Sequence, residues 1–290
     1  MESTSALIRI ADQPALDTVA KPIANAIRTA YGSAGAPGRA AKDAMHGVWL
    51  GHPLHPVFTD IPIGAWTAGL VLDAMAAVRN EPVLEQAADT AIAVGLIGAA
   101  GAAVTGLTDW SETSGLSRRT GLVHGLLNIA ATTLYAAAYI LRKNGSRSAG
   151  QSCAIAGYGV AVGAAWLGGD LVYDQRIGVN HADADEPEKF KQVAKSSELA
   201  DGEMMRGKTG DADVLVVRQH ERLCALNHRC SHLGGPLSEG TLKDGSVVCP
   251  WHGSEFALED GRVITGPATE RQPTLDVREH AGFIEVRSRE

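Results

Sequence analysis

The chain has 290 residues, a formal net charge of −7 and four cysteines. This length is sufficient for two domains, and the acidic balance argues against a nucleic-acid partner. Two of the cysteines lie in the paired motif described below, so a disulfide framework is not expected, which fits a reducing compartment. The first residues, MESTSALIRIADQPALD, contain neither a twin-arginine pair nor a basic stretch followed by an apolar one, and we expect no export signal.

Residues 1–45 are rich in charge and form the expected N-terminal segment. Apolar residues recur among the charges between positions 5 and 30. This pattern predicts an amphipathic helix that lies on a membrane surface or packs on neighbouring helices. The stretch 32–38 is rich in Gly, Ala and Pro and is expected to be a linker.

Four largely apolar runs follow, at residues 61–78, 91–108, 121–141 and 150–169. About 20 residues of helix span a bilayer core, so we expect residues 46–175 to form a bundle of four transmembrane helices arranged as two hairpins. The alternative is a water-soluble bundle, which needs a charged stripe on every helix. Three of the four runs have no such stripe.

Polar residues of this region recur near the helix ends. Each hairpin begins with histidine and ends with aspartate shortly after glycine, which indicates a weak internal repeat. In an up-down-up-down bundle these residues all lie toward one membrane face, and the domain that follows the fourth helix emerges there too. The residues expected at that face are His52, His55, Asp60, Asp109, His124, Asn128, Asp170 and His181.

Three interpretations of this polar group are open, because ionisable residues in membrane helices usually mark function. One is a haem b with two histidine ligands, His124 with His52 or His55. Another is a non-haem iron or zinc site, since His and Asp are suitable ligands. The third is a hydrogen-bonding network that closes the bundle, with or without a quinone pocket.

The C-terminal part has a different pattern. Residues 176–196 are polar and are expected to be a connector, and residues 197–290 contain short alternating runs separated by Asp-Gly and Gly-rich turns. Alternation with period two predicts a small antiparallel β domain. The chain is therefore expected to be an α + β two-domain protein, with a four-helix membrane bundle followed by an all-β domain.

Two short motifs carry the clearest chemistry. Cys230-Ser-His232 and Cys249-Pro-Trp-His252 each supply one thiolate donor and one imidazole donor. A [2Fe–2S] cluster with two cysteines on one iron and two histidines on the other uses this set. A structural zinc site is the alternative, but zinc-finger spacings usually keep the cysteines in one knuckle and the histidines in another.

In its full form, CSHLGGPL…CPWHGSEF, this segment resembles the Rieske ferredoxin family over roughly the last 95 residues. The resemblance implies that Ser254 donates a hydrogen bond to a cluster sulfide. Gly235 and Trp251 occupy the places where quinol-oxidising members have disulfide-bonded cysteines, and Phe256 replaces the tyrosine of high-potential members. The resemblance therefore points to the lower-potential, ferredoxin-like or oxygenase-like branch.

The stretch GHPLHPVFTDIPIGAW, with the later HGLLN, resembles a family of small four-helix membrane proteins of unassigned function, over about residues 45–180. Members of that family are sometimes fused to a Rieske domain. This second resemblance implies a fold but no chemistry.

We therefore expect a membrane-anchored oxidoreductase component that carries one electron at a time, with a redox partner protein or a quinone. An oxygenase or desaturase-like enzyme, in which the cluster feeds the membrane His/Asp group, and a redox sensor are the alternatives. The expected location is a bacterial-type inner or plasma membrane. Basic residues near the helix ends number five on the cluster side and four opposite, which hardly discriminates the orientation. The missing export signal and disulfide favour a cytoplasmic Rieske domain.

Overall fold

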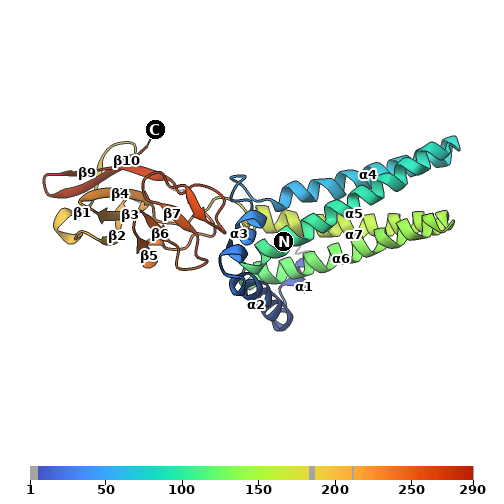
Figure 1. The fold of residues 1–290 in the computed structure, drawn as a ribbon, viewed down its shortest axis with the longest axis horizontal. Coiled ribbons are helices and arrows are strands. Elements are labelled where there is room, and N and C mark those ends of the chain that lie inside the picture. Colours follow the sequence, from blue (N-terminus) through green and yellow to red (C-terminus); the bar gives the residue numbers. More distant parts are fainter. Residues whose placement is uncertain (1–5, 183–186, 211, 290) are drawn as a thin grey trace. The chain divides into compact units, whose positions relative to one another are not determined.

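The computed structural model describes residues 6–182, 187–210 and 212–289. The chain divides into two compact units (Figure 1). The helical unit consists of residues 1–34 and 54–177, and the β unit consists of residues 35–53 and 178–290. Residues 35–53 thus belong to the β unit, although the four long helices lie between them and the rest of that unit in the sequence.

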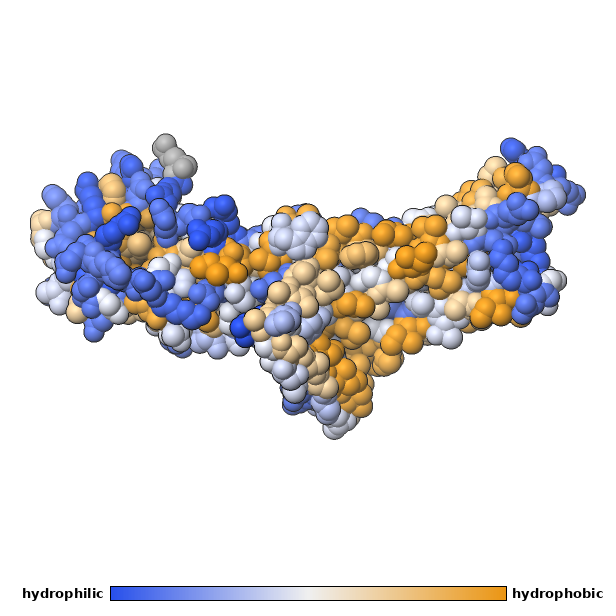
Figure 2. Space-filling model, viewed as in Figure 1, coloured by the Kyte–Doolittle hydropathy of each residue, from blue (hydrophilic) through white to orange (hydrophobic). Residues whose placement is uncertain are grey.

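Four long helices form the body of the helical unit, in two hairpins: α4 (His55–Arg79) with α5 (Pro82–Ser111), and α6 (Gly115–Lys143) with α7 (Arg147–Tyr173). All four are long and apolar enough to cross a membrane. Figure 2 shows apolar residues over the middle of these helices and hydrophilic residues around the turns that close the hairpins. The four expected helices are confirmed.

One buried cluster of the bundle lies on the side of the hairpin turns. There the rings of Trp66 and Tyr135 stack with their centroids 4.0 Å apart and join α4 to α6. Ile92, Ala138 and Ala154 complete this buried cluster. The two hairpins pack on each other far less closely than the helices within each hairpin.

The N-terminal segment forms α1 (Ala6–Ala11) and α2 (Asp17–Ser33), and α2 is amphipathic as expected. Its Ala20 and Ala24 pack on Trp110 and Leu122 of the bundle, while Val19 on the opposite face is 52% exposed. The expected linker at residues 32–38 is wrong, because α3 (Gly35–His46) begins within it after a single intervening residue.

The β unit contains a six-stranded sheet in the order β1-β10-β9-β4-β3-β2 and a four-stranded sheet in the order β5-β6-β7-β8. Every pairing is antiparallel, which confirms the expected all-β domain. β1 lies inside the segment expected as a connector, because it pairs with the last strand of the chain. The strands are β1 (Lys191–Lys195), β2 (Glu203–Thr209), β3 (Ala212–Gln219), β4 (Arg222–Asn227), β5 (Thr241–Lys243), β6 (Ser246–Val248), β7 (Glu255–Ala257), β8 (Val263–Thr265), β9 (Thr274–His280) and β10 (Phe283–Ser288).

Strand β3 shows how the β unit positions its motif. Successive side chains of a strand point to opposite faces. Leu215 and Val217 enter one buried cluster, whereas Val214 and Val216 enter another. The first cluster also contains Cys230 and Cys249, so the two motif loops are anchored in the core of the unit.

Candidate functional site

The two motif loops are closed by the same pair of backbone hydrogen bonds. In the first, the Cys230 N–H donates to the Gly235 carbonyl at 2.9 Å, and the Gly234 N–H donates to the Cys230 carbonyl at 2.8 Å. In the second, the Cys249 N–H donates to the Ser254 carbonyl at 2.8 Å, and the Gly253 N–H returns to the Cys249 carbonyl at 3.2 Å. The loops are therefore equivalent from the cysteine to the fifth residue after it.

Both loops need glycine at the fourth residue after the cysteine. Gly234 has φ 75° and Gly253 has φ 77°, in the left-handed region that side chains disfavour. This turn brings backbone N–H groups to sulfur. The amides of His232 and Leu233 hydrogen-bond the Cys230 sulfur, and those of Trp251 and His252 hydrogen-bond the Cys249 sulfur.

The two thiols lie within hydrogen-bonding reach of each other. Hydrogen bonding from the Cys230 thiol lowers the pKa of Cys249 to about 7, and the amides of Trp251 and His252 act in the same direction. The same thiol-to-thiol bond, with burial, raises the pKa of Cys230. A lowered pKa favours the thiolate of Cys249, which is the form that binds metals.

The two histidines face each other across the same site. Their ring centroids are 5.1 Å apart with the ring planes perpendicular. His232 Nδ1 is buried and has no hydrogen-bond partner. Burial and the neighbouring His252 hold the pKa of His232 well below its usual range, so its imidazole is neutral, as a metal ligand must be.

The donor set of the two loops fits a binuclear cluster. Among residues 6–182, 187–210 and 212–289, no three His, Cys, Asp or Glu side chains are grouped so as to hold one metal ion. In a Rieske cluster each iron takes two protein ligands, two cysteines on one iron and two histidines on the other, which matches the residues of the two loops. The unpartnered Nδ1 of His232 and the amides directed at both sulfurs are consistent with the cluster.

Gln272 supports the first loop and was not anticipated from the sequence. Its amide donates to the Asn227 carbonyl at 2.7 Å and to the Arg229 carbonyl at 2.6 Å, and its Oε1 accepts the Ser231 N–H at 2.9 Å. The side chain is 1% exposed. A glutamine 40 residues beyond the motif carries no local signal of this role.

Ser254 and Phe256 lie beneath the second loop, and both are fully buried. Ser254 Oγ accepts the Ala268 N–H at 2.9 Å, which leaves the hydroxyl proton able to donate elsewhere. Phe256 belongs to the same buried cluster as both motif cysteines. At Gly235 a Cβ atom would lie 2.8 Å from Cys249 Sγ, so this position accepts no side chain without a shift of the site.

The surroundings of the two histidines differ. Trp251, next to His252, is 57% exposed. On the His232 side, His46 from the end of α3 is buried and lies within electrostatic range, as do Lys42 and His181. The Asp43 carboxylate of α3 accepts the Gly266 N–H at 2.9 Å. Residues 35–53 thus cover one side of the site.

The structure connects some residues of the polar group expected at the membrane face, namely His55 with Asp109 and His124, and His124 with Asn128. His181 belongs to the β unit, where its N–H donates to the Ser231 carbonyl at 3.0 Å. His52 and Asp60 are exposed, and the Asp170 carboxylate accepts a bond from Gln175 at 2.6 Å. A non-haem metal site built from these residues has no support, since the described residues contain no group of three such ligands.

His55, His124 and Asn128 do point into contacts between helices. His55 Nδ1 lies 3.0 Å from the Ala102 carbonyl, and His124 Nδ1 lies 2.8 Å from the Ala164 carbonyl. The Asn128 amide reaches His124 Nε2 at 3.1 Å. For Asp109, the described contact is electrostatic, with His55.

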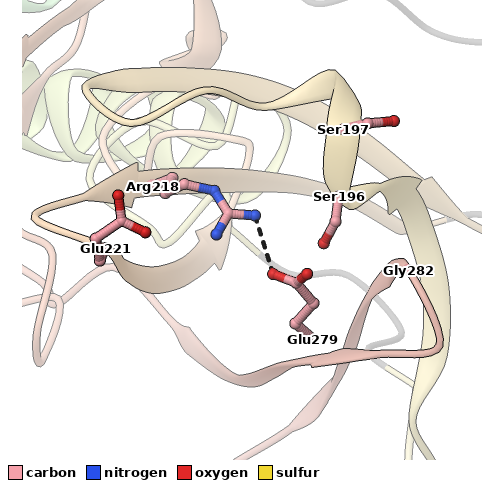
Figure 3. Close-up of a pocket in the computed structure, with 6 residues that line it drawn as sticks. All are labelled: Ser196, Ser197, Arg218, Glu221, Glu279 and Gly282. Carbon is pink, nitrogen blue, oxygen red and sulfur yellow. Dashed lines mark hydrogen bonds and ion pairs between the residues drawn. The ribbon is translucent and has the colours of Figure 1, made fainter.

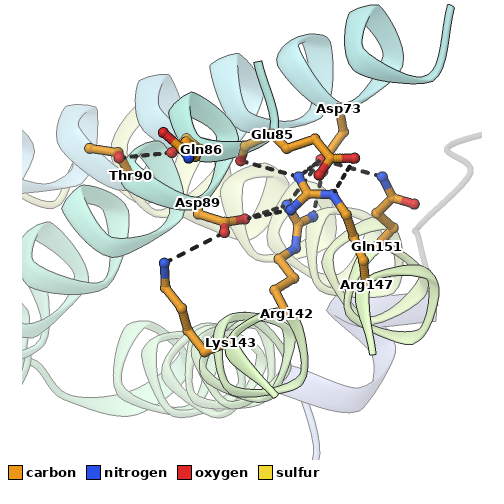
Figure 4. Close-up of polar contacts among 9 residues, drawn as sticks. All are labelled: Asp73, Glu85, Gln86, Asp89, Thr90, Arg142, Lys143, Arg147 and Gln151. Atoms are coloured by element: carbon orange, nitrogen blue, oxygen red, sulfur yellow. Dashed lines mark hydrogen bonds and ion pairs between the residues drawn. The ribbon is translucent and has the colours of Figure 1, made fainter. Parts of the chain in front are cut away.

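A second polar group lies in the half of the bundle near the hairpin turns (Figure 4). Arg142, whose side chain is fully buried, pairs with Asp73 and also lies 3.3 Å from Asp89. Arg147 lies 3.1 Å from Asp73 and 3.2 Å from Asp89. These ion pairs join the two hairpins, and only the position of Asp73 within an apolar run hinted at them.

A surface depression on the β unit is lined by polar residues and contains neither cysteine nor histidine (Figure 3). Its main feature is the ion pair of Arg218 with Glu279 at 3.2 Å. Nothing in this lining resembles the donor set of the motif loops, and we assign it no role in the chemistry.

Comparison with known proteins agrees with this geometry. Residues 189–277 match the Rieske [2Fe-2S] domain, and residues 51–181 match a family described as predicted membrane protein (DUF2231). The chain is 35% identical over 77 residues to the ferredoxin component of biphenyl 2,3-dioxygenase from Rhodococcus jostii (strain RHA1), covering 27% of this chain and 72% of that protein. It is 33% identical over 89 residues to the 3-phenylpropionate/cinnamic acid dioxygenase ferredoxin subunit of Escherichia coli (strain K12), covering 30% of this chain and 83% of that subunit.

Other relatives share only part of their length with this chain. Apoptosis-inducing factor 3 of Mus musculus is 31% identical over 96 residues, which are 33% of this chain and 16% of that protein. Among solved structures, a complex of reduced oxygenase and oxidised ferredoxin in carbazole 1,9a-dioxygenase contains a chain that is 28% identical, with a TM-score of 0.33, covering 34% of this chain and 94% of that one. The chain therefore belongs to the Rieske family, with a [2Fe–2S] domain at residues 189–277 that follows a domain of the predicted membrane protein family DUF2231.

Proposed function

We propose that this protein is a membrane-anchored Rieske electron carrier that moves one electron at a time between a redox partner protein and a membrane-side donor or acceptor. The observation that carries the proposal is the pair of equivalent loops, each with one thiol and one imidazole, in a chain that also has four helices able to span a membrane. A [2Fe–2S] cluster held there supplies reversible one-electron chemistry.

The ligands in this proposal are Cys230 and Cys249 for one iron and His232 and His252 for the other. Three features of the chain support the assignment. The backbone amides directed at each sulfur stabilise negative charge on the thiolates. Burial keeps the His232 imidazole neutral. Gln272 fixes the loop that carries Cys230 and His232.

We propose further that a protein partner meets the cluster at the His252 edge. Trp251 offers an exposed apolar surface beside His252, whereas residues 35–53 cover the His232 side. The relatives named as ferredoxin components of dioxygenases suggest an oxygenase-like partner. An oxygenase activity in this chain itself has less support, because the described part of the helical unit gathers no set of three metal ligands.

The reduction potential is proposed to be low, because Phe256 has no hydroxyl to donate to the cluster, and fewer hydrogen bonds to sulfur give less stabilisation of the reduced form. We also propose that the Rieske domain faces the cytoplasm. In the described residues the four cysteines are free thiols, which suits a reducing compartment.

The test uses the full-length protein purified in detergent. The test has two parts. Membranes that contain the protein are extracted with carbonate, and the protein purified from such membranes is titrated potentiometrically. We expect the protein to stay in the membrane fraction and to take up one electron per chain at a potential in the ferredoxin range. Release by carbonate, or a two-electron titration, would contradict the proposal. Protease treatment of sealed vesicles reports the side on which the Rieske domain lies.

A further inference from the structure

Two histidines of the helical unit occupy equivalent positions in the two hairpins. His55 is the first residue of α4, and its Nδ1 lies 3.0 Å from the Ala102 carbonyl of α5. His124 of α6 places its Nδ1 2.8 Å from the Ala164 carbonyl of α7. In each hairpin the histidine of the first helix is thus tied to a carbonyl near the end of the second.

The equivalence extends to the packing of the rings. Gly106 comes four residues after Ala102, and a Cβ built on it would lie 2.6 Å from His55 Cε1. Gly168 comes four residues after Ala164, and a Cβ there would lie 3.2 Å from His124 Cε1. Each ring therefore lies against a glycine one helical turn beyond the carbonyl it contacts.

This arrangement fixes the tautomer of both rings. A carbonyl oxygen only accepts hydrogen bonds, so Nδ1 carries the proton in each ring and Nε2 of the neutral imidazole carries a lone pair. The Asn128 amide, a donor, lies 3.1 Å from His124 Nε2, as this tautomer requires. Metal-binding histidines are oriented in the same way, by a bond from the other ring nitrogen to a carbonyl. Two Nε2 lone pairs suit a metal and do not suit the carbonyl oxygens of a quinone, which need donors.

The two rings come from different hairpins, so a ligand that both rings bind would lie between the hairpins. His55 and His124 are half-buried and lie close enough to interact electrostatically. Described contacts between the hairpins include the Trp66–Tyr135 stack and the ion pairs of Asp73 and Arg142 (Figure 4). Nearer the other end of the bundle, Trp110 Nε1 of α5 donates to the Arg118 carbonyl of α6 at 2.8 Å.

The number of protein ligands selects the kind of metal centre. An ion that draws all its ligands from protein needs a third donor, and the described residues offer no group of three. A haem iron already has four porphyrin nitrogens and needs only two axial ligands. We propose that His55 and His124 are the axial ligands of a b-type haem held between the two hairpins, with Asn128 releasing His124 Nε2 when the iron binds.

Such a haem would give the membrane domain its own one-electron centre. A ferric haem takes up one electron to become ferrous, which matches the single electron that a reduced [2Fe–2S] cluster releases on returning to its oxidised state. The haem site itself does not depend on the cluster, so the two proposals can fail separately.

The experiment measures haem and cluster together in the full-length protein made in haem-replete cells. We expect about one pyridine-haemochrome equivalent per chain, with a loss of more than about tenfold in His55→Leu and in His124→Leu. His52→Leu is the matched control, because His52 is exposed and contacts only the adjacent Pro53 carbonyl among its described bonds. The EPR signal of the reduced cluster should persist in all three variants and shows that the β unit of each has folded, and extraction in monodisperse form shows that the helical unit is intact.

A variant that leaves a cavity in place of the His124 ring distinguishes loss of an iron ligand from a general disturbance of the fold. His124→Gly should lose low-spin haem absorbance and regain it when free imidazole is added. The proposal is overturned if the wild-type protein has no haem and hemin added to it shows no shift of its Soret band, or if His52→Leu loses haem as His55→Leu does. Cluster EPR with no haem would refute this site alone, whereas haem without a cluster would refute the electron-carrier proposal alone.

Discussion

The β unit and the helical unit hold their polar chemistry in opposite ways. In the β unit, the four candidate ligands come from two short loops, and each loop closes with its own backbone bonds. In the helical unit, the partners are far apart in sequence: 40 residues separate His124 from Ala164, 47 separate His55 from Ala102, and 69 separate Arg142 from Asp73. A site made of local motifs survives small shifts of the fold, whereas a site made of distant pairs depends on how the helices pack.

The largest expected effect concerns the local site. Replacing Cys249 with serine removes a thiolate donor, and we expect essentially complete loss of cluster iron and of visible absorbance. Cys153→Ser is the matched control, since this free cysteine lies in α7 and belongs to neither loop. Iron and sulfide analysis of both variants checks the prediction. A Cys249→Ser protein that retains a full complement of iron would contradict the assignment.

Next in size is the distant pairing in the helical unit. Arg142→Leu leaves the carboxylates of Asp73 and Asp89 without their buried partner, and breaking a buried pair in this way typically costs about 3–5 kcal/mol. Lys143→Leu is the control, because its ammonium group is 54% exposed and 3.6 Å from Asp89. Thermal unfolding of both variants in detergent gives the comparison. Equal unfolding temperatures of the two variants would show that the ion pairs of Arg142 do not stabilise the packing of the two hairpins.

A smaller effect is expected from the support of the first loop. Gln272→Ala leaves the Asn227 and Arg229 carbonyls and the Ser231 N–H without their partner, which we expect to cost about 2–3 kcal/mol and to speed cluster loss. Gln219→Ala removes a glutamine with two exposed hydrogen bonds and should cost less than about 0.5 kcal/mol. Denaturant titrations followed by cluster absorbance measure both. If the two variants lose the cluster at the same denaturant concentration, the loop does not depend on Gln272.

The smallest effect is on the reduction potential. Phe256→Tyr adds a hydroxyl in the buried cluster that contains both motif cysteines. One new hydrogen bond to sulfur, at about 1 kcal/mol, should raise the potential by about 40 mV for a one-electron couple. Phe190→Tyr is the control, since this ring packs 3.9 Å from the Arg278 guanidinium. Voltammetry of the two proteins should show a positive shift of the reduction potential in Phe256→Tyr only. A shift of the same size in both variants would show that the effect does not come from a hydrogen bond at position 256.

Features that depend on neighbouring residues could be predicted from the sequence, whereas features that depend on distant residues could not. The paired loops, the four apolar helices and the antiparallel β domain depend on local spacing and periodicity, and all three are present in the fold. Gln272, the pairing of β1 with β10 and the position of Asp43 beside Gly266 depend on residues that meet only after folding. His181 was expected with the helices because it follows them in sequence, and the bond from its backbone N–H to the Ser231 carbonyl of the cluster loop could not be predicted from that position.

Two of the basic residues at the hairpin turns, Arg142 and Arg147, are not free charges. Counting basic residues near the helix ends treats Arg142 and Arg147 as free charges, but both are paired with Asp73 and Asp89 inside the bundle. Distant pairing of this kind cannot be read from one sequence, because neither partner has a local signature.

The most direct test of the central claim is EPR spectroscopy of the chemically reduced full-length protein, with iron and sulfide analysis of the same sample. The account predicts two irons and two sulfides per chain, and a reduced cluster whose spin couples to two histidine nitrogens, assigned by labelling histidine with nitrogen-15. A colourless protein with one zinc per chain, or a cluster signal with no histidine nitrogen coupling, would contradict it.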